Sequence, residues 1–309
     1  MSKWTPQQMP SQQERLAIVT GANSGIGYQT ARYLARAGAT VILACRSAAK
    51  GEAARARIVA ENAAAKIEVR ALDVADLDSV RRFAAEFLSE GKPLDLLINN
   101  AGVMAIPERR TTPQGFEMQF GTNHLGHFAL TGLLLPALLR QPKSRVVTVA
   151  SIAHKGGKLN FDDLNGERGY DPRGAYQQSK LANLVFGLEF DRRLRAHSAN
   201  TTSVIAHPGV AVTNIISNGM GTGMKGRVVG ALLPLVAQSD DRGSWPLVYA
   251  STSSEVHGGG YYGPDGIAEI KGMPVEVKPK PQALDPAAGK RLWDVSETLT
   301  GVRYDALDT

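Results

Sequence analysis

The glycine-rich stretch TGANSGIG at residues 20–27 constrains the fold more than any other feature of the chain. It follows directly on the apolar, β-branched run RLAIVT at 15–20 and opens into a helical pattern over about 26–37. Gly21 and Gly25 allow a tight turn and the close approach of a pyrophosphate, and Gly27 lets the helix pack against the strand. The helix N-terminus then offers free N–H groups to the phosphates. This strand–loop–helix setting predicts a nucleotide-binding βαβ unit, against the alternative of a glycine-rich turn without a ligand.

Short apolar runs alternate with longer helical patterns along the rest of the chain. Strands are expected at 15–20, 40–45, 67–73, 94–99, 145–150 and 200–209, with helices at about 26–37, 48–62 and 76–90 between the first four. Strands that alternate with helices of this length indicate βαβ units around a parallel sheet with both faces covered. The predicted fold is therefore α/β: a doubly wound parallel sheet of the Rossmann type, in three α/β/α layers and a single domain.

No internal repeat or low-complexity linker divides the chain. We expect a polar N-terminal tail over 1–13, the nucleotide-binding domain over 14–271, and a partly helical C-terminal extension over 272–309. An irregular, apolar and glycine-rich segment occupies about 215–238, after the sixth expected strand.

Composition excludes several classes of protein. With 43% hydrophobic and 21% charged residues, a chain of 309 residues can bury a full core. Cys45 is the single cysteine, so an internal disulfide is excluded and a reducing compartment is the natural setting. Residues 1–10 lack the apolar region of a secretory signal, and the most apolar run, 128–139, is too short to span a membrane. We therefore expect a cytoplasmic protein without a transmembrane segment.

The net charge of +6 does not indicate nucleic-acid binding, because the basic residues are scattered and no basic stripe is interleaved with aromatic residues. A polyphosphate ligand suits such a chain better. The six histidines show no metal-ligand spacing, so no metal is expected, and local hydrogen bonds or packing account better for His124 and His127. Asp162 and Asp163 are expected in an exposed turn rather than as a catalytic carboxylate pair.

Further motifs follow the glycine loop in a fixed order. The loop itself has the spacing G-x-x-x-G-x-G, and LDVAD, NNAG, VASIAH, YQQSK and HPGVAVT follow it along the chain. Together these motifs resemble the short-chain dehydrogenase/reductase family over about 16–266. The stretches SIAHKGGKLNFDDLNGE, YQQSKLANLVF and GGGYYGPDG are most similar to its retinol-dehydrogenase-like and protochlorophyllide-reductase-like branch.

The resemblance implies a catalytic tetrad of Asn123, Ser151, Tyr176 and Lys180. Tyr176 and Lys180 lie four residues apart and project from one helix face. A tyrosine needs its pKa lowered by about 3 units to transfer protons near neutral pH, which is about 4 kcal/mol of preference for phenolate. A nearby ammonium can supply this only in a dry cleft. By resemblance, Tyr176 donates or accepts the proton, Lys180 lowers its pKa and binds the nicotinamide ribose, Ser151 orients the substrate oxygen, and Asn123 kinks a helix and links the lysine to a water relay.

The resemblance also implies which residues bind a nicotinamide cofactor. They are Gly21, Asn23, Ser24, Gly25, Ile26, Gly27, Arg46, Asp73, Val74, Asn100, Ala101, Gly102, Tyr176, Lys180, Pro208, Gly209 and Thr213. Cys45 stands where an acid would select NAD, and the guanidinium of Arg46 suits a 2′-phosphate. We therefore expect NADP(H) in preference to NAD(H), against the alternative that Arg46 is a solvated residue after a strand.

The implied activity is an NADP(H)-dependent interconversion of a carbonyl compound and an alcohol. By resemblance, a mobile substrate lid lies at about 210–240. Its apolar sequence suggests a lipophilic small-molecule substrate such as a retinoid, steroid or fatty aldehyde. The alternative is that this apolar segment is a packed helix or a dimer surface. The long stretch between Ser151 and Tyr176 is expected to form a loop over the substrate cleft. The alternatives are a carbon–carbon double-bond reductase of the protochlorophyllide-reductase type, which the lack of a second cysteine disfavours, and a non-catalytic NADPH-binding scaffold. By family analogy the protein would be a homodimer or homotetramer.

Overall fold

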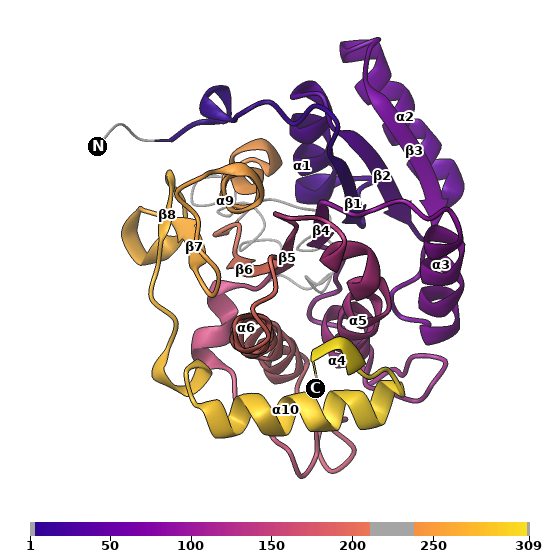
Figure 1. Ribbon diagram of the computed structural model, residues 1–309. Helices are drawn as coiled ribbons and strands as arrows, with labels where there is room; N and C mark the ends of the chain where they lie inside the picture. Colours follow the sequence, from indigo (N-terminus) through magenta and orange to yellow (C-terminus); the bar gives the residue numbers. More distant parts are fainter. Residues whose placement is uncertain (1–3, 211–237, 308–309) are drawn as a thin grey trace.

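The computed structural model describes residues 4–210 and 238–307, and within them eight strands form one sheet (Figure 1). Their order across the sheet is β3-β2-β1-β4-β5-β6-β7-β8, and every neighbouring pair is parallel except β7 and β8. The strands are β1 (Leu16–Thr20), β2 (Thr40–Cys45), β3 (Lys66–Ala71), β4 (Leu96–Asn99), β5 (Arg145–Val149), β6 (Thr202–Ala206), β7 (Tyr261–Pro264) and β8 (Pro274–Glu276). The predicted doubly wound parallel sheet is confirmed.

The sheet reverses its strand order between β1 and β4. The chain builds outward from β1 to β3, then returns to the other side of β1 and continues through β4, β5 and β6. In open α/β sheets, ligands bind outside the carboxyl ends of the strands at such a reversal. The fold therefore directs a search for the site to the residues that follow β1 and β4.

Helices cover both faces of the sheet, as the buried apolar clusters show. One cluster joins the sheet to α1 (Gly25–Arg36), α2 (Ala48–Glu61) and α9 (Asp240–Thr252). The other joins it to α3 (Leu77–Ser89), α5 (Gly126–Leu139) and α6 (Pro172–Ala196). The apolar run over 128–139 forms most of α5, and most of its apolar residues lie in this second cluster.

The segment 272–309, expected as a C-terminal extension, adds structure to this domain. It contributes β8, which pairs antiparallel with β7, and α10 (Pro286–Thr300), which packs across α6 and α5 (Figure 1). Trp293 of α10 is 1% exposed, and its ring centroid lies 4.4 Å from that of Tyr304 and 5.2 Å from that of Phe128 in α5. Aromatic rings thus join the last helix to the core.

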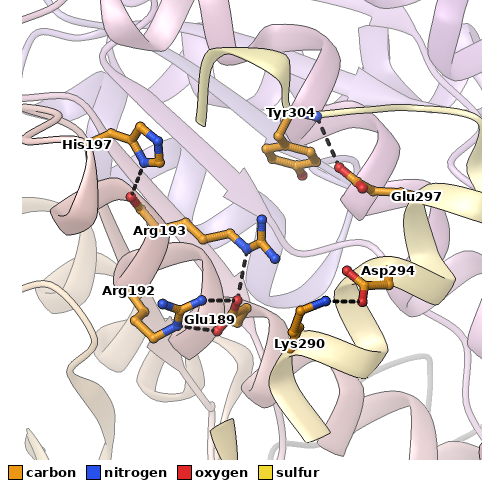
Figure 2. Close-up of polar contacts among 8 residues, drawn as sticks. All are labelled: Glu189, Arg192, Arg193, His197, Lys290, Asp294, Glu297 and Tyr304. Atoms are coloured by element: carbon orange, nitrogen blue, oxygen red, sulfur yellow. Dashed lines mark hydrogen bonds and ion pairs between the residues drawn. The ribbon is translucent and has the colours of Figure 1, made fainter. Parts of the chain in front are cut away.

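A buried carboxylate lies on α6 beneath α10. Figure 2 shows Glu189, whose side chain is 3% exposed, accepting hydrogen bonds from both Arg192 and Arg193. The guanidinium of Arg193 also lies 4.3 Å from the ring centroid of Trp293. Because a buried charge must be paired, these arginines allow α10 to close over Glu189.

The strands β7 and β8 were not predicted from the sequence. The six expected parallel strands are present, with ends shifted by a few residues. Most of the irregular segment 215–238 lies outside the described residues. Among the residues that are described, no helix is long and apolar enough to cross a membrane.

The packing of α10 makes a testable prediction about stability. Trp293→Ala should lower the free energy of unfolding by about 3–5 kcal/mol, because it leaves a cavity among Phe128, Phe190 and Tyr304. Leu284→Ala, a change at a side chain that is 55% exposed in the same terminal segment, is the control and should cost less than about 0.5 kcal/mol. Urea unfolding measures both; equal effects would contradict the assignment of α10 to the core.

Candidate active site

A cavity of about 480 Å³ runs along the carboxyl ends of the parallel strands. The volume lies within the usual range for small-molecule sites. The structure brings into its lining these residues singled out from the sequence: Gly21, Asn23, Ser24, Gly25, Ile26, Gly27, Arg46, Asp73, Val74, Asn100, Ala101, Gly102, Ser151, Tyr176, Lys180, Pro208 and Gly209. Asn123 lies behind the lining, and Thr213 and most of the expected lid lie outside the described residues.

The glycine loop packs directly on the turn after β4. Gly21 and Gly25 have φ angles of 66° and 59°, in the left-handed region that favours glycine. A Cβ at Gly27 would lie 2.3 Å from the side-chain nitrogen of Asn100, and one at Gly21 would lie 3.0 Å from the Cα of Ala101. The side chain of Ser24, the N-cap of α1, makes no hydrogen bond to the helix, so the first N–H groups of α1 face the cavity available for an anion.

Thr20, the last residue of β1, fixes that turn through a buried hydrogen-bond network. Its hydroxyl oxygen accepts from the backbone N–H groups of Asn100 and Ala101, each at 2.9 Å, and lies 2.9 Å from Nε2 of His127. Nδ1 of His127 lies 3.0 Å from the carbonyl oxygen of Asn123, which can only accept, so Nδ1 carries the proton. Nε2 therefore accepts from the Thr20 hydroxyl, and burial keeps the ring neutral by lowering the pKa of His127 to about 4.

Asn123 does not line the cavity but hydrogen-bonds Val103, which does. It lies in a π-helical turn, Gly121–Leu125, that interrupts the helix between α4 (Met118–Phe120) and α5. Its side chain accepts from the N–H of Val103 at 2.8 Å and donates to the carbonyl of Val103 at 2.9 Å. It also donates to the hydroxyl of Ser179 on α6 at 2.9 Å. Asn123 thus connects the segment after β4 to the helix that carries Tyr176 and Lys180.

Ser151, Tyr176 and Lys180, which were expected from the sequence to act in proton transfer, line the cavity where β5 and α6 border it. Nζ of Lys180 lies 5.9 Å from the ring centroid of Tyr176 and donates to the carbonyl of Val149 at 3.0 Å. Burial raises the pKa of Tyr176, while a hydrogen bond with Ser151 acts to lower it. Burial also lowers the pKa of Lys180 to about 8. In the described site, therefore, the phenol is protonated at neutral pH and the lysine is close to its titration range.

Three polar residues of the lining were missed in the sequence, namely Ser47, Lys50 and Thr122. Ser47 and Lys50 join Arg46 at the end of the cavity nearest β2. Ser47 is the N-cap of α2, and its hydroxyl accepts from the N–H of Lys50 at 3.4 Å. No helical spacing could have indicated Lys50, because Arg46 lies before the N-cap of α2 and outside the helix.

A partly buried group of Lys155, His207 and Glu269, hereafter the ion-pair group, joins the segments that contain Ser151 and Pro208. Lys155, shortly after Ser151, contacts Oε1 of Glu269 at 2.7 Å, and Nε2 of His207 lies 3.2 Å from Oε2. Nδ1 of His207 accepts from the N–H of Gly209, so Nε2 carries the proton and faces the carboxylate. His207 first, and then Lys155, lower the pKa of Glu269 to about 2.

The stretch between Ser151 and Tyr176 does not lie where it was expected. Beyond Ile152 and Ala153, it contributes no lining residue to the cavity as the described residues form it, so the expected loop over the cleft is not found. Its hydrogen bonds run instead to the segment 106–119 and to α6. Asp163 sits in a turn there, accepting from the N–H groups of Glu167 and Arg168.

Known proteins resemble this chain over most of its length. The profile of the family described as short chain dehydrogenase matches residues 15–226. Retinol dehydrogenase 13 of Homo sapiens is 42% identical over 296 residues, covering 93% of this chain and 85% of that protein. Polyprenol dehydrogenase of Mus musculus is 42% identical over 302 residues, covering 96% of this chain and 87% of that protein. The crystal structure of an uncharacterized protein from Mycobacterium Paratuberculosis has a TM-score of 0.81 and 42% identity, covering 98% of this chain and 99% of the other.

The ion-pair group predicts a pH-dependent contribution to stability. The folded pKa of Glu269 lies below its ordinary value of 4.5, so its contribution is present above pH 4.5 and is lost as the pH falls toward 2. Glu269→Gln should therefore cost roughly 1 kcal/mol at pH 7, after allowance for solvent screening, and much less near pH 2. Unfolding free energies measured by urea titration across this range test it. Asp294→Asn, at the exposed Lys290–Asp294 pair of Figure 2, is the control; a Glu269→Gln cost independent of pH would refute the assignment.

Proposed function

This chain belongs to the short-chain dehydrogenase family, and we propose that it is an NADP(H)-dependent oxidoreductase in which Tyr176 transfers the proton between a carbonyl compound and an alcohol. The observation that carries the proposal is that Ser151, Tyr176 and Lys180 line the same cavity as the glycine loop. A nucleotide held on that loop would lie beside the three groups that can hold and protonate a substrate oxygen.

The residues present fit a nicotinamide dinucleotide. The glycine loop leaves no room for a side chain but leaves the first N–H groups of α1 available to a pyrophosphate. Asp73 and Val74 line the cavity beside the loop, and Asn100 to Gly102 form the floor after β4. When bound, the cofactor would supply the hydride to a carbonyl carbon or accept it from an alcohol.

The charges at the end of β2 support NADP(H) over NAD(H). Cys45 is buried where an acid would repel a 2′-phosphate, so no carboxylate opposes the phosphate there. Arg46 and Lys50 both line that end of the cavity, and Ser47 offers a hydroxyl and a helix N-terminus between them. Two cations and a helix start suit a phosphate better than a ribose hydroxyl.

Ser151, Tyr176 and Lys180 would each have a separate role at the substrate oxygen. The Ser151 hydroxyl would donate to the substrate oxygen and hold it beside the phenol of Tyr176, which gives up its proton as negative charge develops on that oxygen. Lys180 would stabilise the phenolate left behind. Asn123 would hold Val103 and α6 in register so that these groups keep their positions.

A lipophilic alcohol or carbonyl compound is the proposed substrate class. Val103, Met104 and Ile152 line the cavity near Ser151 and Tyr176, and they present apolar surface beside the reacting groups. The relatives named for retinol and for polyprenol are named for lipophilic alcohols, which agrees with this lining.

Removal of one hydroxyl tests the catalytic role against a non-catalytic scaffold. Tyr176→Phe should lower kcat for aldehyde reduction by roughly 10²- to 10⁴-fold, because the general acid is lost. NADPH oxidation, followed by absorbance, measures turnover, and fluorescence titration should show unchanged NADPH binding. Tyr304→Phe loses a phenol that donates to the carbonyl of Phe128 away from the cavity, and should leave turnover unchanged. Bound NADPH with no turnover by the wild type over a panel of aldehydes and ketones would support the scaffold instead.

Charge reversal at Arg46, directly after β2, tests the cofactor preference. Arg46→Asp should reduce the preference for NADPH over NADH by roughly 10- to 100-fold, since a charge-assisted hydrogen bond contributes about 1.5–3 kcal/mol. The ratio of kcat/KM for the two cofactors measures the change. Arg82→Asp, on the exposed side of α3, controls for net charge; an unaltered ratio in Arg46→Asp would refute the NADP(H) assignment.

A further inference from the structure

The wall of the cavity after β4 is held in a strained conformation. Val103 and Met104 line the cavity, and Ala105, the next residue, has a φ of 52° in the left-handed region. A residue with a Cβ costs roughly 1–2 kcal/mol in that region, so surrounding contacts must hold it there.

Gln119 on α4 supplies one of these contacts and is fully buried. Its side-chain carbonyl accepts from the N–H of Ala105 at 2.7 Å. Its side-chain amide donates to the Tyr170 hydroxyl at 3.1 Å and to the carbonyl of Pro172 at 3.0 Å. An amide group cannot be turned round in this setting, because each partner requires the atom that faces it.

Tyr170, in the long stretch before α6, supplies the other contact. Its hydroxyl donates to the carbonyl of Ile106 at 2.7 Å while it accepts from Gln119, so it uses both its donor and an acceptor. The same stretch holds the wall further along, where the carbonyl of Asn165 accepts from the guanidinium of Arg109.

The partners of Gln119 connect the wall to the helix that carries the proton donor. Pro172 is the first residue of α6, and Tyr176 lies one turn further along the same helix. Gln119 and Tyr170 therefore join the segment after Met104 to the start of this helix, in addition to the contact that Asn123 makes between Val103 and Ser179. A substrate lying between Met104 and Tyr176 would meet a wall of fixed position.

We propose that Gln119 and Tyr170 are positioning residues that determine substrate specificity, by holding the Val103–Ile106 wall against the Tyr176 helix. The proposal rests on the proposed function. It also gives the long stretch before α6 a role, because Tyr170 in that stretch holds residues 103–106, two of which line the cavity, in place. With the wall fixed, a bulky lipophilic carbonyl compound is oriented by apolar contact, whereas a short one depends little on the wall.

The test removes one hydroxyl at each of two sites with matched chemistry. Tyr170→Phe loses a phenol that donates to the carbonyl of Ile106 at 2.7 Å, and the control Tyr304→Phe loses one that donates to the carbonyl of Phe128 at 2.7 Å, away from the cavity. Each variant is assayed with NADPH and either decanal or propanal. Tyr170→Phe should raise KM for decanal and lower the decanal/propanal ratio of kcat/KM by roughly five- to tenfold, with kcat retained. Tyr304→Phe should leave the ratio within about twofold.

A second measurement does not depend on turnover. Hydrogen exchange of the peptide 103–106 should be faster in Tyr170→Phe and in Gln119→Met than in the wild type or Tyr304→Phe. A wild type that reduces neither aldehyde would refute the proposed function, while the exchange data would still report on the wall. Unchanged exchange in Tyr170→Phe, or an aldehyde ratio equal to that of Tyr304→Phe, would overturn the proposal.

Discussion

The contact between the glycine loop and the turn after β4 is the constraint on which the rest of the site depends. A Cβ at Gly27 would lie 2.3 Å from the side-chain nitrogen of Asn100, and one at Gly21 would lie 3.0 Å from the Cα of Ala101. This contact sits where the strand order reverses, so it joins the two halves of the sheet at the point where a ligand can enter. A Cβ at either glycine would therefore force the loop or the turn after β4 to shift, and both line the cavity.

A buried polar network extends that constraint to α6, the helix that contains Tyr176 and Lys180. Thr20 holds the turn after β4, His127 connects Thr20 to the backbone of Asn123, and the side chain of Asn123 reaches Ser179 on α6. All these groups are buried and hydrogen-bonded, so breaking one contact would leave a buried donor or acceptor without its partner. The end of the cavity at the glycine loop and the end at α6 are therefore one connected structure, although the residues that form them lie far apart in the sequence.

The sequence predicted the parts of this arrangement that depend on local patterns. Alternation of apolar runs and helices gave the parallel sheet, and motifs that follow strand ends gave residues that the structure gathers around one cavity, since parallel strands end at the same edge. Contacts between distant segments could not be predicted in this way. β8 is three residues long and exists because β7 pairs with it, and the position of Tyr170 depends on a buried glutamine on α4. Lys50 was missed for a different reason: its role depends on how the turn after β2 orients the first turn of α2.

Under the proposed function, the pKa directions at Tyr176 and Lys180 bear on how a proton would be transferred. Burial raises the pKa of Tyr176, and the ammonium of Lys180 is already engaged with the carbonyl of Val149. A protonated phenol beside Ser151 is ready to donate to a carbonyl oxygen, whereas accepting a proton from an alcohol first requires the phenolate. Burial works against that anion, and only Ser151 offsets it here, so oxidation needs additional positive charge in the cavity. Lys180 has two further N–H groups with which to help, and its own pKa of about 8 means that this help fades as the pH rises. Under the proposed function, the protonated phenol is therefore the form that reduces a carbonyl, and the phenolate that oxidises an alcohol would need stabilisation by Lys180.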